Sequence, residues 1–444
     1  MYLSWLFISF VWAQTIPWQD GDFGCIDQGT AQRYVRDYNI NTRSFGGMEL
    51  CNAKVDTKKL FNDLAIIENG NFADTPNDNV FIRGIIPLHD YYKWMKSETR
   101  GMNRGNDVPA ATAYNRMGYF TMQDGWALLS TLGRVGTVIH EARHTAGYRH
   151  IACRQGPYQD ASLAGCDRDY EYGGSHAVEM EYYARVSVLG TNFHPVYKTM
   201  ARLMGIARSN FVFNKPVIQK KEAMLALSST TGRADLLTEE GYLFEREAPM
   251  QEGILKRTSF GGVIYNGRDA WSIELYGNVP LHTPLQDTYS YFKLLLEDQN
   301  PAFQFEEFDL GSKRFAIKMK DNQSLQFFEF PQGRWGRVIN TNFTVATTAT
   351  RLENGQNGLF LISREGAIYP VDPQRKAIGG ALPFAWNPEV AQVAQLGERL
   401  YVLKQDGVIY QKTDSRRYQP VGISQDRYRG LINVPIYNGF NVEP

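Results

Sequence analysis

The chain has no net charge and, beyond its first residues, no long apolar segment. It carries 47 basic and 47 acidic residues among 444, so no basic excess marks it for nucleic acid or an anionic membrane surface. After residue 13, no run approaches the roughly 20 apolar residues that a membrane-spanning helix needs. We therefore expect no nucleic-acid partner and no transmembrane anchor.

Cysteine is scarce, with four copies in the chain. An even number of cysteines in a chain that looks exported suggests disulfides. Sequence order favours the pairs Cys25–Cys51 and Cys153–Cys166, although other pairings stay open and Cys153 could instead bind a metal. A bond between Cys153 and Cys166 would close a short loop and stabilise the fold by about 3 kcal/mol.

The first 13 residues are almost wholly apolar. Val11 and Ala13 fit the small-residue positions before a signal-peptidase cleavage site, which would leave Gln14 at the mature N-terminus. The run lacks a positively charged start, and the alternative is a buried N-terminal strand. We expect residues 1–13 to be a signal peptide and the protein to be secreted or periplasmic.

Histidine is also sparse, with seven copies, and three of them form one spaced motif. Residues 140–150 read H-E-x-x-H-x-x-G-x-x-H. On a helix, His140 and His144 share one face and can hold one Zn²⁺ ion. Glu141 is rotated off that face, where it can reach a water on the metal. Gly147 can end the helix and turn the chain so that His150 becomes the third ligand, which leaves a fourth position open for water.

This motif resembles that of the metzincin clan of zinc metallopeptidases. The resemblance implies that His140, His144 and His150 are zinc ligands, that Glu141 is the general base, and that the substrate is a polypeptide. It also implies a Met-containing turn, for which Met180 is the nearest candidate, although the surrounding segment reads as a helix.

Two further expectations concern the surroundings of the motif. The resemblance implies that a strand at 119–123 forms the upper edge of a sheet, where an extended substrate can pair. Tyr170 or Tyr172 could stabilise an oxyanion, and the favoured alternative for either is a loop tyrosine packed on the surface.

A rival assignment of the third ligand remains open. In other H-E-x-x-H peptidases, a Glu on a downstream helix completes the site. Glu179 lies on such a predicted helix, and His176, three residues earlier, can share its face. Under this alternative, His150 is a loop histidine.

The segment 14–214 reads as an α+β domain. Apolar spacing and capping residues predict helices at 30–41, 56–69, 90–99 and 195–207 and along the motif itself. The segment 80–87 alternates enough to be a strand. The segment 101–110 has loop composition.

The segment 215–444 reads as an all-β domain. Two similar hairpins, centred on Gly366 and Gly407, lie 41 residues apart (407 − 366), with weaker echoes at Gly241 and Asp321. A period near 40 with about four strands per unit suggests a β-propeller, here of about five blades. The alternative is a β-sandwich with two similar hairpins. We expect this half to present substrate or bind a protein partner.

The sequence thus predicts an exported zinc-dependent endopeptidase in which Glu141 is the general base. The alternative is an exported binding or envelope protein whose zinc site is structural or vestigial and whose β-propeller carries the function.

Overall fold

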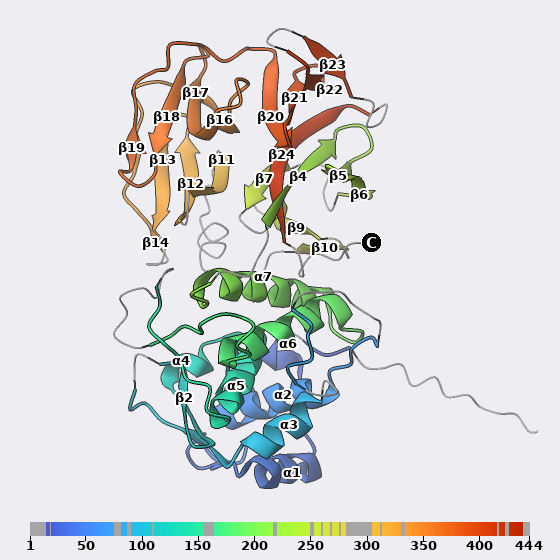
Figure 1. The fold of residues 1–444 in the computed structure, drawn as a ribbon, viewed down its shortest axis with the longest axis vertical. Helices are drawn as coiled ribbons and strands as arrows, with labels where there is room; N and C mark the ends of the chain where they lie inside the picture. The colour runs from blue at the N-terminus through green and yellow to red at the C-terminus, as the bar shows by residue number, and fades with distance from the viewer. Residues whose placement is uncertain are drawn as a thin grey trace, which may run out of the picture. The chain divides into compact units, whose positions relative to one another are not determined.

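The computed structural model describes most of the chain and divides it into two compact units (Figure 1). The described residues are 15–17, 19–74, 81–86, 90–108, 111–154, 164–215, 220–248, 253–258, 261–266, 269–274, 277–280, 304–310, 313–329, 334–414, 417–421 and 426–437. The first unit comprises Met1–Asp78, Ile82–Arg149 and Gly173–Ala201, and the second comprises Asn79–Phe81, His150–Tyr172 and Arg202–Pro444. The predicted signal peptide lies outside the described residues.

Helices make up most of the first unit. They are η1 (Asp20–Asp22), α1 (Gln28–Tyr38), α2 (Asp56–Asn69), α3 (Tyr91–Glu98), α4 (Asp124–Ala127), α5 (Thr131–Thr145), α6 (Ser175–Leu189) and α7 (Pro195–Phe211), the last of which continues into the second unit. Side chains cap several of these helices where the chain enters them: Asp27 accepts from Thr30 N, Asp90 from Lys93 N and Ser130 from Gly133 N. Such caps satisfy backbone N–H groups that have no partner within the helix. The helices expected from the sequence are confirmed.

One small sheet accompanies the helices, and it corrects two expectations. Its strands are β1 (Gly101–Arg104), β2 (Ala113–Arg116) and β3 (Tyr119–Met122), in the order β1-β3-β2. The prediction that 101–110 is entirely loop is wrong, because its first four residues pair in parallel with β3. The strand at 119–123 is confirmed, but its placement at an edge is wrong because β1 and β2 cover its two sides.

The prediction of a strand at 80–87 is also wrong, because the described residues of this segment, 81–86, form turns and bends. Gly84 has a φ of +75°, which breaks an extended chain. Its N–H and that of Ile85 donate to the Glu181 carboxylate at 3.1 and 2.9 Å. A buried side chain therefore takes the hydrogen bonds that a neighbouring strand would have supplied.

Helix α5 packs on α2 and α6 and is buried for most of its length. Its Arg134 is only 1% exposed and makes two hydrogen bonds, of 3.0 and 2.9 Å, to Asp63 on α2, which is 0% exposed. Two more, of 2.9 and 2.6 Å, reach Asp20 in η1. A charged side chain is tolerated at such depth only when it is fully paired. The pairing thus fixes the first turns of α5 against two other segments.

The second unit contains small four-stranded sheets. They are formed by β4 (Lys220–Ser228), β5 (Arg233–Thr238), β6 (Gly241–Glu247), β7 (Ile254–Thr258), β8 (Gly261–Tyr265), β9 (Ala270–Glu274), β10 (Gly277–Pro280), β11 (Gln304–Leu310), β12 (Lys313–Asp321), β13 (Ser324–Glu329), β14 (Arg334–Trp335), β15 (Ile339–Asn340), β16 (Val345–Arg351), β17 (Asn357–Ser363), β18 (Ile368–Asp372), β19 (Ala377–Ile378), β20 (Val390–Leu396), β21 (Arg399–Lys404), β22 (Ile409–Lys412), β23 (Tyr418–Pro420) and β24 (Tyr428–Tyr437). Among the described residues these strands form five sheets, one of which carries the short β15 as an addition.

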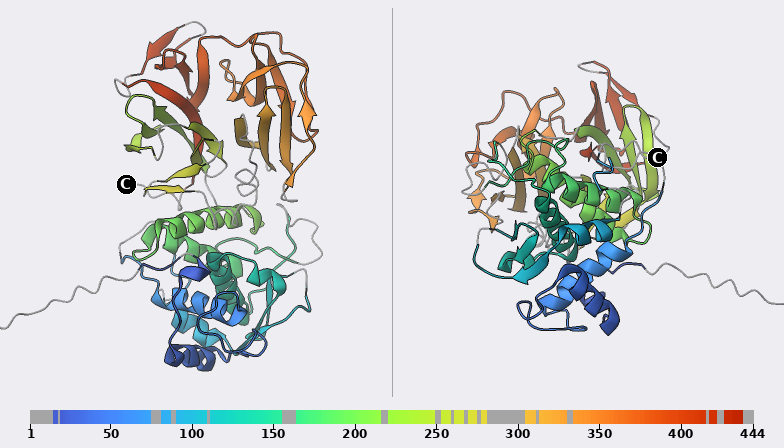
Figure 2. Two further views of the ribbon diagram at one scale, coloured as in Figure 1. Left: turned by 180° about the vertical axis from the view of Figure 1, so that it is seen from behind. Right: turned by 60° about the horizontal axis from the view of Figure 1, so that its bottom comes forward.

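The five sheets contact one another in a closed ring. Strand β24 contacts β7 and β20, β7 contacts β11, β11 contacts β16, and β16 contacts β20. The last strand of the described residues, β24, pairs antiparallel with β4 and so completes the sheet that begins the ring (Figures 1 and 2). A ring of four-stranded meanders is consistent with a β-propeller. The expectation of an all-β region with repeated antiparallel hairpins is confirmed.

Gly366 and Gly407 occupy equivalent turns, as their spacing predicts. Their φ values are +83° and +78°. Each N–H closes its turn, onto Ser363 O at 3.0 Å and Lys404 O at 2.9 Å. Each carbonyl accepts a 2.7 Å hydrogen bond from the chain leading into the next sheet, from Trp386 N and Tyr428 N. The turns therefore link neighbouring sheets.

Of the two weaker echoes of the repeat, one occupies the equivalent turn and the other does not. Asp321 is the last residue of β12 and enters the equivalent turn, where Asn322 O accepts a 2.7 Å hydrogen bond from Val345 N. Gly241 is the first residue of β6, in the β5–β6 hairpin, which is one hairpin away from the equivalent position. That position is the β4–β5 turn, where Gly232 has a φ of +65°.

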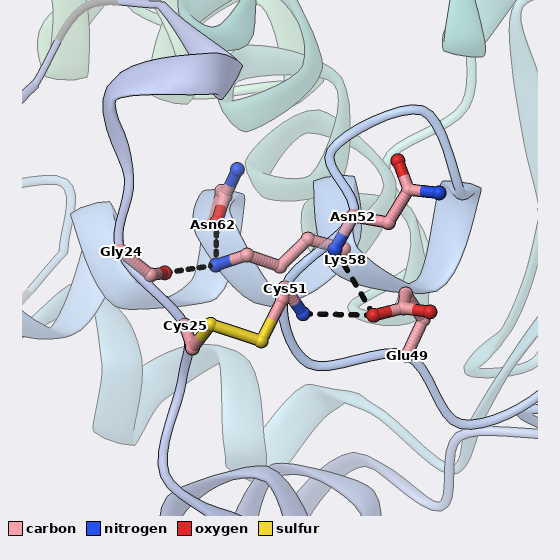
Figure 3. Close-up of a disulfide and its surroundings, with 7 residues drawn as sticks. All are labelled: Gly24, Cys25, Glu49, Cys51, Asn52, Lys58 and Asn62. Carbon is pink, nitrogen blue, oxygen red and sulfur yellow. Dashed lines mark hydrogen bonds between the residues drawn. A yellow bond between two sulfur atoms is a disulfide. The ribbon is translucent and has the colours of Figure 1, made fainter.

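Both disulfides form with the predicted pairing, Cys25–Cys51 and Cys153–Cys166. Beside the first, Lys58 Nζ donates to Gly24 O and Asn62 Oδ1, each at 2.7 Å (Figure 3). Cys153 is thus excluded as a metal ligand in this state. Two intact disulfides are compatible with an extracellular or periplasmic protein. Within the described residues, no helix has the length and apolarity to cross a membrane.

The ion pair between Arg134 and Asp63 gives a test of what holds α5. Arg134→Met leaves the Asp63 carboxylate buried without its cation, so we expect a loss of about 3–5 kcal/mol in unfolding free energy. Chemical denaturation measures it. Lys96→Met is the control, since Lys96 pairs with Asp37 at 2.8 Å but is 50% exposed, and should cost under about 1 kcal/mol. Equal losses in the two variants would show that the buried pair does not anchor the helix.

Candidate metal centre

The predicted motif lies at the C-terminal end of α5. His140 and His144 follow one another by one helical turn, and their ring centroids are 4.9 Å apart. The helix ends at Thr145, and Gly147 adopts a φ of +89°, which lets the chain turn as predicted. His150 follows three residues later.

The structure brings the predicted ligands together. Ligand atoms of His140, His144 and His150 all lie within 4.8 Å of one another. A second group, His140 with His176 and Glu179, satisfies the same limit. The second group contains Glu179 but not His144, so it is not the rival set of the sequence analysis, in which Glu179 joins both His140 and His144. His140 belongs to both groups, and either group could hold a metal ion.

Each histidine of the motif has an acceptor near its Nδ1 atom. His150 Nδ1 lies 3.1 Å from Asp167 Oδ1 and His140 Nδ1 lies 3.3 Å from Glu179 Oε2. His144 Nδ1 contacts Tyr148 O and lies 3.0 Å from Ser175 Oγ. An acceptor at Nδ1 favours a proton there and a lone pair on Nε2, the tautomer that binds metal through Nε2.

Asp167 is one of these partners that the sequence analysis misses. It is 2% exposed and is held by two backbone hydrogen bonds, to Val212 O at 2.9 Å and from Asn214 N at 3.0 Å. The neighbouring Cys166 is fixed by its disulfide and by a bridge to Ile151. The only signal in the sequence is an acidic residue beside a cysteine, which names no partner.

Glu179 is held from two further directions. Tyr183 OH donates to Glu179 Oε1 at 2.9 Å, and His176 Nδ1 lies 3.4 Å from Glu179 Oε2. Tyr183 can approach this closely because residue 136, one turn before His140, is glycine. A Cβ atom at Gly136 would lie 1.9 Å from the Tyr183 hydroxyl oxygen. In the sequence, the only sign of this contact is a glycine within a predicted helix, which often marks a close approach of another side chain.

Glu141 is buried next to these residues. It is 4% exposed, and its Oε2 atom has no hydrogen-bond partner among the described residues. Burial, and secondarily the charge of Glu179, raises the pKa of Glu141 to about 8. A divalent cation at the histidines would act in the opposite direction, because it favours the ionised carboxylate. A water on such a cation would also give the buried oxygen a partner.

The other sequence candidates lie in ordinary structural positions. Tyr170 is 1% exposed and donates to Phe81 O at 2.7 Å, so it is a core residue. Tyr172 is 37% exposed, with the Arg168 guanidinium over its ring. Met180 is buried within α6, in agreement with the helix predicted there.

The contact at Gly136 can be tested directly. Gly136→Ala forces Tyr183 and Glu179 to move, and we expect a loss of about 1–3 kcal/mol in stability, the usual cost of overpacking. Thermal unfolding measures it. In a Tyr183→Phe background the clashing oxygen is absent, so the same alanine should cost less. If the cost is unchanged, the contact is not what requires glycine.

Comparison with known proteins adds no functional assignment. No family model matches the chain, and no curated protein matches it. Similar solved structures include BBS1N in complex with ARL6DN (10% identity, TM-score 0.26, covering 46% of this chain and 64% of that chain). Others are apo AztD from Citrobacter koseri (9%, 0.23, 48% and 60%) and the Dos1 propeller (14%, 0.23, 43% and 52%). The matched part spans less than two thirds of each of these chains.

Proposed function

We propose that the protein is an exported zinc-dependent endopeptidase. The observation that carries the proposal is the cluster of His140, His144 and His150 donor atoms within 4.8 Å, with buried Glu141 next in sequence to the first ligand. Three imidazoles with a neighbouring carboxylate are the donor set of a catalytic rather than a structural zinc site.

When bound, zinc would supply Lewis acidity toward water and toward the scissile carbonyl. The three histidines would hold the ion, and Glu179 and Asp167, next to Nδ1 of His140 and His150, would keep those two imidazoles in orientation. Glu141 accepts a proton from water as the water oxygen attacks the carbonyl carbon. It then donates that proton to the amide nitrogen as the C–N bond breaks, so that one acid and one amine leave.

The second unit would serve as a module for binding substrate or a protein partner. A ring of small sheets presents loops at both ends and suits such a role. In this proposal the substrate is a polypeptide, with cleavage outside the cell or in the periplasm.

A second candidate function has its own supporting observation. Glu179 and His176 lie beside His140 as further donors, and four protein donors would close the coordination sphere and leave no site for water. The protein would then be a non-catalytic exported binding or envelope protein. Its zinc would be structural or vestigial, and its propeller would carry the function.

Metal removal and Glu141→Gln separate the two functions. Chelation should abolish cleavage of an unfolded polypeptide such as casein, and added zinc should restore it. Glu141→Gln should keep about one zinc per chain and lower kcat by about 10²–10⁴-fold, because the amide cannot accept the proton. Elemental analysis and a cleavage assay measure these outcomes. A zinc-loaded wild-type protein that cleaves nothing would favour the binding protein.

His150→Ala and Glu179→Ala test which residue completes the site. His150→Ala removes a proposed ligand and should weaken zinc binding far more than Glu179→Ala. The latter removes an orienting acceptor, for which losses of about 10–100-fold are usual. Competition with a chromogenic chelator measures both affinities. The reverse ranking would make Glu179 the third ligand, while Glu141 could keep its role.

A further inference from the structure

A cavity of about 590 Å³ opens within the second unit. Its walls come from β4, β5, β7, β16, β17, β20 and β24, so four of the five sheets contribute. It lies at the end of the ring where β16 turns into β17 and β20 into β21. The size falls in the range of sites for small ligands, which is about 300–1,000 Å³.

The cavity has six charged side chains in its lining, and most of them pair with each other. Arg257 donates to both oxygens of Glu222, at 3.2 and 3.0 Å. Lys221 lies 3.7 Å from Glu240. Arg351 and Glu239 remain, and neither has an ion-pair partner among the residues described.

These two remaining charges differ in environment. Glu239 is exposed, where water can solvate a carboxylate at little cost. Arg351 is half-buried, and its hydrogen bond to Gly355 O, at 3.4 Å, is long. A guanidinium has five donors in a planar fork, so most of the hydrogen-bonding capacity of Arg351 is left for a ligand.

The neighbouring Arg257 adds a second positive charge near Arg351 in the cavity lining. The pKa of Arg351 is lowered, first by burial, with Arg257 adding to the effect and Glu222 opposing it. Glu222, whose side chain is 40% exposed, pairs with Arg257, and it acts on Arg351 only through its charge, without forming an ion pair with it.

We propose that this cavity binds the carboxylate group of a peptide, with Arg351 as its principal contact. A carboxylate accepts two parallel hydrogen bonds from a guanidinium, the geometry that Arg351 offers. The acidic side chains Glu222, Glu239 and Glu240 would repel a doubly charged phosphate more strongly than a singly charged carboxylate. Thr350 and Asn357 in the lining can bond to peptide groups. The proposal does not depend on the metal centre.

Calorimetric titration of the full-length protein tests the site with three blocked tripeptides, each confirmed intact afterwards. Acetyl-Ala-Ala-Ala carries a terminal carboxylate, acetyl-Ala-Asp-Ala-amide a side-chain carboxylate, and acetyl-Ala-Ala-Ala-amide neither. We expect at least one acid to bind more tightly than the neutral amide. Preference between the two acids then identifies the source of the carboxylate.

Three variants tie the binding to the cavity. Arg351→Gln should weaken the preferred acid by about 10–100-fold, the loss usual for a charge-assisted contact. Glu222→Gln should strengthen it, because both guanidinium groups lose their competing carboxylate. Arg375→Gln is the control, since its side chain is 85% exposed and its ion pair with Asp372 is local.

The proposal is overturned if the neutral amide binds as well as both acids, or if no peptide binds. It is also overturned if Arg351→Gln keeps full affinity in a protein that unfolds at the wild-type temperature. Binding of an acid to the metal centre instead would be insensitive to Arg351 and would therefore be distinguished by the same variant.

Discussion

The burial of α5 is the constraint on which the first unit depends. A helix sunk into the core can carry polar side chains only where each finds a partner. Arg134 finds Asp63 and Asp20 near the start of the helix. His140 finds Glu179 one and a half turns later. The same packing that secures the helix therefore also positions the candidate metal ligand His140, because α6 places Glu179 beside it.

The sequence predicted what depends on short spacing. The i, i+4 histidines, the turn at Gly147 and the neighbouring cysteine pairs are all local or nearly local, and the structure places them as expected. The predictions for residues 81–86 and 101–104 were wrong because the structure of these segments depends on residues outside them. Glu181, about 100 residues downstream, takes the N–H groups of Gly84 and Ile85, and β3 turns Gly101–Arg104 into a strand. Neither partner can be read from the segment itself.

The β repeat shows the same limit on a larger scale. A turn glycine with positive φ is required by local backbone geometry, so Gly366 and Gly407 stand out in the sequence. Strand β24 cannot be recognised in this way, because it pairs with β4, which lies some 200 residues earlier in the chain. Gly241 was a misleading match to the repeat, because glycine is favoured near the tight turn of any hairpin in a sheet. Periodicity therefore revealed the repeating unit but not how the ring closes.

The electrostatics of the metal centre link its packing to its proposed chemistry. Glu141 and Glu179 are both almost fully buried, and the charge of one raises the pKa of the other. Glu179 has Tyr183, His140 and His176 as neighbours, whereas Oε2 of Glu141 has no partner among the described residues. Two buried acids near three imidazoles form a site whose charge balance improves when a divalent cation is added. Free energy gained on binding that cation then adds to the stability of the fold, because the unfolded chain does not hold these donors together. The contacts among Gly136, Tyr183 and Glu179 thus keep one carboxylate oriented toward His140 and leave Glu141 beside it, where the proposed mechanism requires a base.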